Sequence, residues 1–97
     1  MDRIWLKSYP EGVPADVNLG KLRTLVQLID EACSGYADSP AYVQMGRTLT
    51  YREMDQLSRQ FAAYLQKTCR LAQGERIAIM LPNVLQYPIA MFAALRC

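Results

Sequence analysis

Side chains that commonly carry out chemistry are sparse in this 97-residue sequence and do not form a recognisable site. The sequence contains no histidine, which excludes an imidazole base or metal ligand from this chain. The close carboxylate pairs are Asp30 with Glu31 and Glu53 with Asp55, which fall on the expected polar faces of helices and are interpreted as solvated charge. The sequence lacks a glycine-rich phosphate loop and a nucleophile elbow. We therefore predict no catalytic, cofactor-binding or metal-binding residue in this chain.

The cysteines, Cys33, Cys69 and Cys97, are odd in number and widely spaced, and they form no Cys-x-x-Cys pair. This pattern fits neither a disulfide framework nor a zinc site, and it predicts reduced thiols in a cytoplasmic protein. Cys33 lies on an apolar helical stripe, so we expect a buried and unreactive thiol there rather than a nucleophile.

The charge balance gives no support for a nucleic-acid partner. Eleven Lys and Arg residues against nine Asp and Glu residues leave a formal charge of only +2, whereas nucleic-acid-binding domains are usually strongly basic. The scattered arginines are interpreted as a solvated face rather than a phosphate patch; they are Arg47, Arg52, Arg59 and Arg70.

One uncharged run, from Ile77 to Leu95, is long enough to span a bilayer. Pro82 and Pro88 interrupt it, and each proline removes a backbone donor and strains a helix. We therefore interpret the run as a strand, a turn and a helix, with membrane insertion as the alternative. The N-terminus lacks the apolar core of a signal peptide.

Hydrophobic spacing predicts an N-terminal arm over residues 1–23 and a folded region over residues 24–97. The arm is expected to be extended because prolines and glycines punctuate it. Its apolar residues Trp5, Leu6 and Tyr9 either pack on the same chain or contact a neighbouring subunit.

The folded region begins with a helix that is capped by Thr24, with Gln27 in capping-box spacing. This helix should end before Pro40. A β-hairpin over residues 41–50 follows, with its turn at Gly46-Arg47. The apolar stripe of the helix has helical period and consists of Leu25, Leu28, Ile29, Ala32, Cys33 and Tyr36.

A second helix is predicted from a capping box at Thr50 and Glu53, with Leu49 and Met54 as a hydrophobic staple. It should run to about Cys69. Its inward stripe is expected to be Met54, Leu57, Phe61, Leu65 and Thr68, flanked by Ser58, Ala62 and Tyr64.

The apolar run 76–81 does not alternate, which predicts a strand covered on both faces with neighbouring strands in a parallel sheet. A last helix should follow, with Asn83 as a candidate cap. Because Pro88 lacks the donor for a bond back to Val84, either its first turn is irregular or the regular helix begins near Gln86. Because such a unit implies a further strand, we expect an N-terminal fragment of a larger α/β protein rather than a complete small domain.

Several blocks of this sequence resemble the acyl-activating, adenylate-forming enzyme superfamily. The signature-like blocks are 49–54, 57–58 and 74–83. Further blocks are similar to the N-terminal part of bacterial long-chain fatty-acid–CoA ligases; they are 4–6, 9–10, 13–14, 61–66, 82–88 and 95–96.

The resemblance implies the start of the large N-terminal domain of such an enzyme. The full-length enzyme would convert fatty acid, ATP and CoA to acyl-CoA, AMP and pyrophosphate through an acyl-adenylate, with Mg²⁺. The family's phosphate loop, acyl pocket and catalytic lysine match no residue here, so the chain alone is expected to be inactive and to bind no cofactor.

The resemblance also implies a homodimer, with Trp5, Leu6 and Tyr9 as the subunit-contact arm, in a cytoplasmic enzyme that associates peripherally with the inner face of the membrane. Two alternatives stay open. One is a non-catalytic self-association module, and the other is a different adenylate-forming enzyme, such as another acyl-CoA synthetase.

Overall fold

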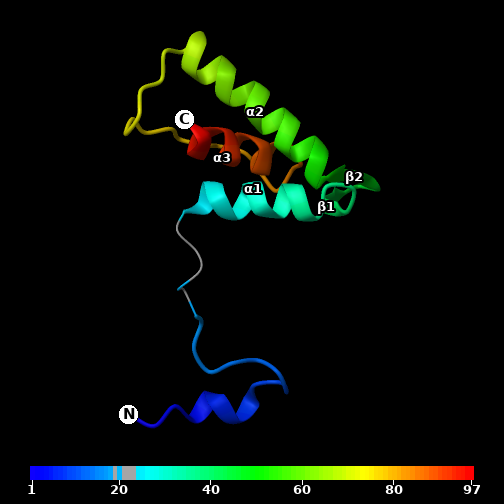
Figure 1. Cartoon of the computed structure of the whole chain (residues 1–97), viewed down its shortest axis with the longest axis vertical. Coiled ribbons are helices and arrows are strands. Elements are labelled where there is room, and N and C mark those ends of the chain that lie inside the picture. Colours follow the sequence, from blue (N-terminus) through cyan, green and yellow to red (C-terminus); the bar gives the residue numbers. More distant parts are fainter. Residues whose placement is uncertain (19, 21–23) are drawn as a thin grey trace.

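The computed structural model describes residues 1–18, 20 and 24–97 (Figure 1). Three helices pack against one another, with α2 in contact with both α1 and α3, and a hairpin packs at one end of α2. The mixed α/β class predicted from the sequence is confirmed. The elements in chain order are η1 Ile4–Ser8, α1 Leu25–Gly35, β1 Pro40–Gln44, β2 Arg47–Thr50, α2 Tyr51–Lys67 and α3 Gln86–Arg96.

Helix α1 begins as its capping signal predicts. The Thr24 side chain accepts a hydrogen bond of 3.1 Å from the backbone N–H of Gln27. The buried stripe is narrower than expected, because Cys33 is buried and Ile29 is half-buried while Leu25 is largely exposed. Helix α1 therefore contributes only one edge of its apolar face to the core.

The hairpin forms with its turn one residue earlier than predicted. Strands β1 and β2 pair antiparallel, and the turn residues are Met45 and Gly46, with φ angles of 47° and 77°. A two-residue hairpin turn with positive φ at both positions matches the twist of the strands. Arg47 consequently begins β2 instead of completing the turn.

Helix α2 has the predicted capping box. The N–H of Glu53 donates to Thr50 Oγ1 over 3.2 Å, and the N–H of Thr50 donates to Glu53 Oε2 over 2.9 Å. The expected inward stripe is confirmed only at Met54, because Leu57 and Phe61 are exposed. The other buried residues are Ser58 and Ala62, which were expected to flank the stripe. The small side chains of Ser58 and Ala62 let α3 approach α2 closely.

Helix α3 begins at Gln86, which was one of the two expected alternatives, but the predicted Asn83 cap is wrong. A side chain of β1 binds the backbone at the start of α3 instead. The N–H of Leu85, the residue before the helix, donates a hydrogen bond of 3.2 Å to Gln44 Oε1. The Gln44 amide in turn donates to the carbonyl of Asn83 over 3.2 Å. The core lies among the three helices and β2 and consists of Cys33, Leu49, Met54 and Phe92.

The predicted buried strand over residues 76–81 is wrong. This segment is not paired with another strand within the described residues, and Met80 is 96% exposed. The physical reason is that a strand needs neighbours to satisfy its backbone, and the one described sheet contains only β1 and β2.

The N-terminal arm is not extended throughout, because Ile4–Ser8 forms a 3₁₀ helix. It lies apart from the helices (Figure 1), and Arg3 pairs with Asp16 over 2.9 Å. Positions 19 and 21–23 of the predicted arm lie outside the described residues. Of the described helices, none has the length and hydropathy that a membrane span requires.

Candidate functional site

The most connected charged group in the described residues is an ion cluster that joins α1, α2 and α3. Arg96 donates through Nη1 to Asp30 and through Nη2 to Asp55, both over 2.7 Å. Arg59 contacts the same two carboxylates over 3.0 Å. We call these four residues the ion cluster. Asp30 and Asp55 are therefore not simply solvated charges, because both form ion pairs between helices, whereas the Arg59 side chain is 55% exposed, in agreement with the predicted solvated face.

Burial within the ion cluster is uneven. The Arg96 side chain is only 8% exposed, whereas those of Asp30 and Asp55 are 43% and 26% exposed. Arg96 Nε is buried and has no hydrogen-bond partner among the residues that the structure describes. A side-chain hydrogen bond to Asp55 raises the pKa of Arg59. The ion cluster therefore holds three helices together by charge-assisted hydrogen bonds.

Cys33 lies in the core beneath the ion cluster. Burial, and then the nearby Asp55 carboxylate, raise the pKa of its thiol. A protonated thiol is a poor nucleophile. The prediction of a buried, unreactive Cys33 is confirmed as to burial, and the raised pKa agrees with low reactivity.

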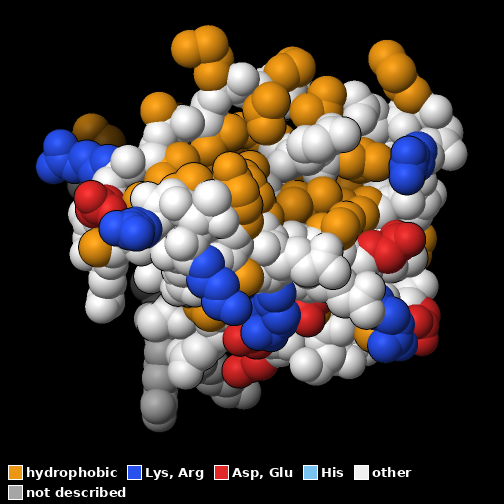
Figure 2. All heavy atoms as spheres, turned by 90° about the horizontal axis from the view of Figure 1, so that it is seen from above, with side chains coloured by type: hydrophobic (Ala, Val, Ile, Leu, Met, Phe, Trp, Pro, Cys, Tyr) orange, Lys and Arg blue, Asp and Glu red, His pale blue; other side chains and the backbone are white. Residues whose placement is uncertain are grey.

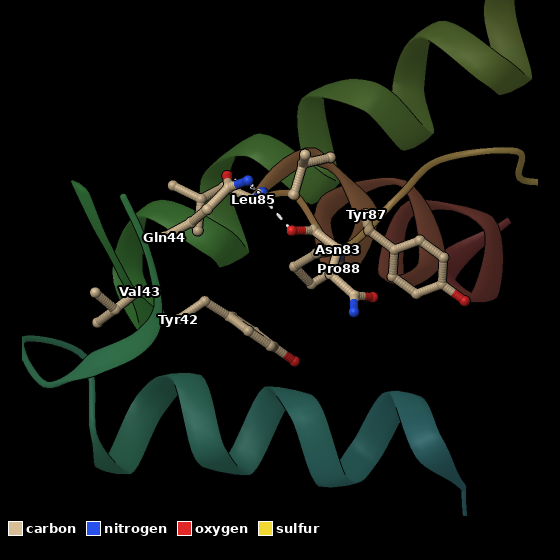
Figure 3. Close-up of a pocket in the computed structure, with 8 residues that line it drawn as sticks. Tyr42, Val43, Gln44, Asn83, Leu85, Tyr87 and Pro88 are labelled. Carbon is tan, nitrogen blue, oxygen red and sulfur yellow. Dashed lines mark hydrogen bonds between the residues drawn. The ribbon is translucent and has the colours of Figure 1, made fainter. Parts of the chain in front are cut away.

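A second feature is an open pocket of about 260 Å³ between β1 and the start of α3. Figure 3 shows Tyr42 and Gln44 projecting from β1, and Asn83 and Tyr87 near the start of α3. The Gln44 amide is already occupied by its bonds to the backbone of Asn83 and Leu85. Burial raises the pKa of Tyr42, which keeps this phenol neutral. The pocket can therefore offer neutral donors and acceptors but no charge.

The predicted contact residues of the arm lie in neither the ion cluster nor the pocket. Trp5 and Tyr9 are largely exposed, Leu6 is half-buried, and none of them lines the pocket or touches the ion cluster. Their role in subunit contacts stays a prediction.

The described part of the chain contains no candidate metal site. Among residues 1–18, 20 and 24–97, no group of three Cys, Asp or Glu side chains is placed to hold a metal ion. The absence of catalytic and cofactor-binding residues stays a prediction.

Sequence reasoning missed Arg96 and Gln44. The Asp55–Arg59 pair has i,i+4 spacing and could have been found from the sequence. Asp30 and Arg96 are 66 residues apart, so no local pattern could indicate their contact.

Comparison with known proteins gives a consistent picture. Residues 29–97 match the family model described as AMP-binding enzyme. The chain is 48% identical over 96 residues to a long-chain-fatty-acid–CoA ligase from Salmonella typhimurium and 46% identical to one from Yersinia pestis, in each case over 99% of this chain and 17% of the relative. A ligase of the same name from Bacillus subtilis is 32% identical over 94% of this chain and 16% of the relative. The chain thus spans about a sixth of these relatives. No solved structure matches it.

Proposed function

The chain belongs to the AMP-binding enzyme family, and on that premise we propose that it is the N-terminal scaffold segment of a long-chain fatty-acid–CoA ligase. The observation that carries the proposal is the 48% identity to such a ligase along nearly the whole chain. The complete enzyme would convert fatty acid, ATP and CoA to acyl-CoA, AMP and pyrophosphate through an acyl-adenylate.

No chemical step is assigned to the described residues, and the lack of a site for ATP, Mg²⁺ or CoA among them is part of the proposal. Their contribution is mechanical. The ion cluster fixes α1 against α2 and α3, and Gln44 fixes the start of α3 against the hairpin. A rigid support keeps the parts of an enzyme that do carry catalytic groups within catalytic distance of one another.

Segment replacement tests this proposal. A chimaera in which this chain replaces the matching segment of the Salmonella typhimurium ligase should keep acyl-CoA synthesis within a few-fold of that ligase. A matched chimaera with Met54→Asp should lose activity, because Met54 is only 1% exposed and a buried unpaired carboxylate disrupts the core.

The chain by itself, given fatty acid, ATP, Mg²⁺ and CoA, should release neither pyrophosphate nor acyl-CoA. Product formation by the isolated chain would contradict the scaffold role. An inactive first chimaera that is folded by circular dichroism would contradict its assignment to this ligase.

For the complete enzyme we propose a cytoplasmic homodimer in which Trp5, Leu6 and Tyr9 contact the partner, with peripheral association with the inner face of the membrane. The exposure of Trp5 and Tyr9, on an arm that lies apart from the helices (Figure 1), supports the proposed contact. Cross-linking of the complete enzyme through a cysteine placed at Tyr9 would test this contact.

A second candidate function is a non-catalytic self-association module. It is favoured by one observation, the exposed apolar side chains of Ile77, Met80 and Leu81. Figure 2 shows apolar side chains gathered over one part of the surface, with charged side chains mainly beside them. An active first chimaera would reject this alternative as the main role of the chain.

A further inference from the structure

The turn that leads into α3 is held by a side chain from a different element. The Gln44 amide of β1 donates to the carbonyl of Asn83 and accepts from the N–H of Leu85, each over 3.2 Å (Figure 3). These two backbone groups flank Val84, and a residue of a parallel strand bonds to the same two groups of its neighbour. The Gln44 side chain therefore takes the place of one strand residue beside Val84.

Pro88 favours a different start for this helix. Proline is preferred at the first position of a helix, because it has no N–H group and its φ is already helical. The residue before a proline is disfavoured in the helical conformation, because it contacts the proline ring. Both preferences would start the helix at Pro88, with Tyr87 extended. The helix nevertheless starts at Gln86, so Tyr87 is helical directly before a proline.

Few contacts support the observed start. Leu85, the residue before the helix, makes no capping hydrogen bond with its side chain. Within the turn, the N–H of Val84 donates to the carbonyl of Pro82 over 2.8 Å, and the N–H of Tyr87 donates to the carbonyl of Val84 over 3.0 Å. Among the described residues, Gln44 is the one side chain that hydrogen-bonds to the backbone of 83–87. The choice between the two starts therefore depends on Gln44.

We infer that Gln44 selects where α3 begins. With its amide bound to the turn, the helix starts at Gln86. Without it, the helix starts at Pro88, and both Gln86 and Tyr87 become extended. The rest of α3 keeps its place in either state, because its fully buried contact, Ala93, lies more than one turn beyond Pro88.

The first turn of α3 is thus an element with two states, and a single amide on β1 decides between them. This inference goes beyond the scaffold assignment and does not depend on it, because every group that it uses belongs to the described residues of this chain.

Backbone chemical shifts of the 97-residue chain, measured by NMR, test the inference residue by residue. Gln44→Met keeps a side chain of similar length but offers no amide donor and only a weak acceptor. In this variant Gln86 and Tyr87 should lose the helical Cα shifts that they have in the wild type, while 89–96 should keep theirs. The matched control is Gln60→Met, the same substitution at an exposed glutamine of α2, and it should leave all of these shifts unchanged.

A second variant separates the choice of helix start from a general loss of packing. Pro88→Ala removes the restriction on Tyr87. When it is combined with Gln44→Met, the helical shifts of Gln86 and Tyr87 should return. They should return although Pro88 is buried and its truncation lowers the stability of the chain.

Four results would overturn the inference. One is a Gln44→Met variant in which Gln86 and Tyr87 stay helical. The second is a loss of helical shifts throughout 89–96 in that variant, because Gln44 would then support the whole helix rather than its start. The third is a double variant without recovery, because the proline would then not be what opposes the start at Gln86. The fourth is a wild type in which Gln86 and Tyr87 are already extended.

Discussion

Replacing Arg96 by methionine removes the buried cation of the ion cluster while keeping a side chain of similar length. Two hydrogen bonds of 2.7 Å disappear, one to Asp30 and one to Asp55. Hydrogen bonds to charged groups contribute about 1.5–3 kcal/mol each. Removing one partner of a fully buried ion pair costs about 3–5 kcal/mol.

The cost is smaller here for two reasons. Asp30 and Asp55 keep Arg59 as a partner, and their side chains are 43% and 26% exposed, so water replaces part of the lost interaction. We therefore expect Arg96→Met to lower the free energy of unfolding by about 2–3 kcal/mol. In a domain of this size that corresponds to a fall in Tm of roughly 10–20 °C.

Urea unfolding followed by far-ultraviolet circular dichroism measures this loss. The matched control is Arg52→Met, because Arg52 forms an ion pair of 2.8 Å with Asp38, and their side chains are 57% and 85% exposed. An exposed pair of this kind contributes at most about 1 kcal/mol. The two variants should therefore differ by more than 1 kcal/mol.

A double-mutant cycle tests the contact itself. Asp30→Asn combined with Arg96→Met should show a coupling free energy of about 1 kcal/mol, because the two residues are in contact. Equal losses for Arg96→Met and Arg52→Met, or additive effects in the cycle, would refute the reasoning that the ion cluster holds the helices together.

Three further predictions concern local features. Cys69 is exposed and should react rapidly with a thiol reagent, whereas Cys33 should react only after the chain unfolds; equal rates by mass spectrometry would contradict its burial. The hydrogen bonds from Thr50 hold the pKa of Glu53 below its usual value, so the stability that Glu53 contributes is present above the unfolded pKa of about 4.3 and is lost as pH falls through the folded pKa. The difference in urea midpoint between wild type and Glu53→Gln should therefore shrink below about pH 4, and a constant difference would count against the capping interaction. Gln44→Ala should lower the free energy of unfolding by about 1–2 kcal/mol, measured by the same urea unfolding, because it leaves an N–H group at the start of α3 without a partner; no change would mean that water replaces the amide.

The features that the sequence predicted well are local. The Thr50–Glu53 capping box and the Thr24 cap each depend on residues three apart, and both form as expected. Turn placement failed by one residue because Met45, which seldom adopts positive φ, does so beside Gly46.

Features that depend on tertiary contact could not be predicted. Ser58 is buried on α2 because α3 packs closely there, although hydrophobicity alone favours Leu57 and Phe61. The cap on α3 comes from Gln44, 41 residues before the N–H group it binds. The burial expected for 76–81 likewise required strand neighbours that the described residues do not supply.

The distance in sequence across the ion cluster has a consequence during synthesis. Asp30 and Arg96 are separated by 66 residues. A ribosome that adds about 5–20 residues per second makes Arg96 roughly 3–13 s after Asp30. During that interval α3 has not yet been synthesised. The apolar side of α1 is therefore accessible to chaperones before α3 can cover it.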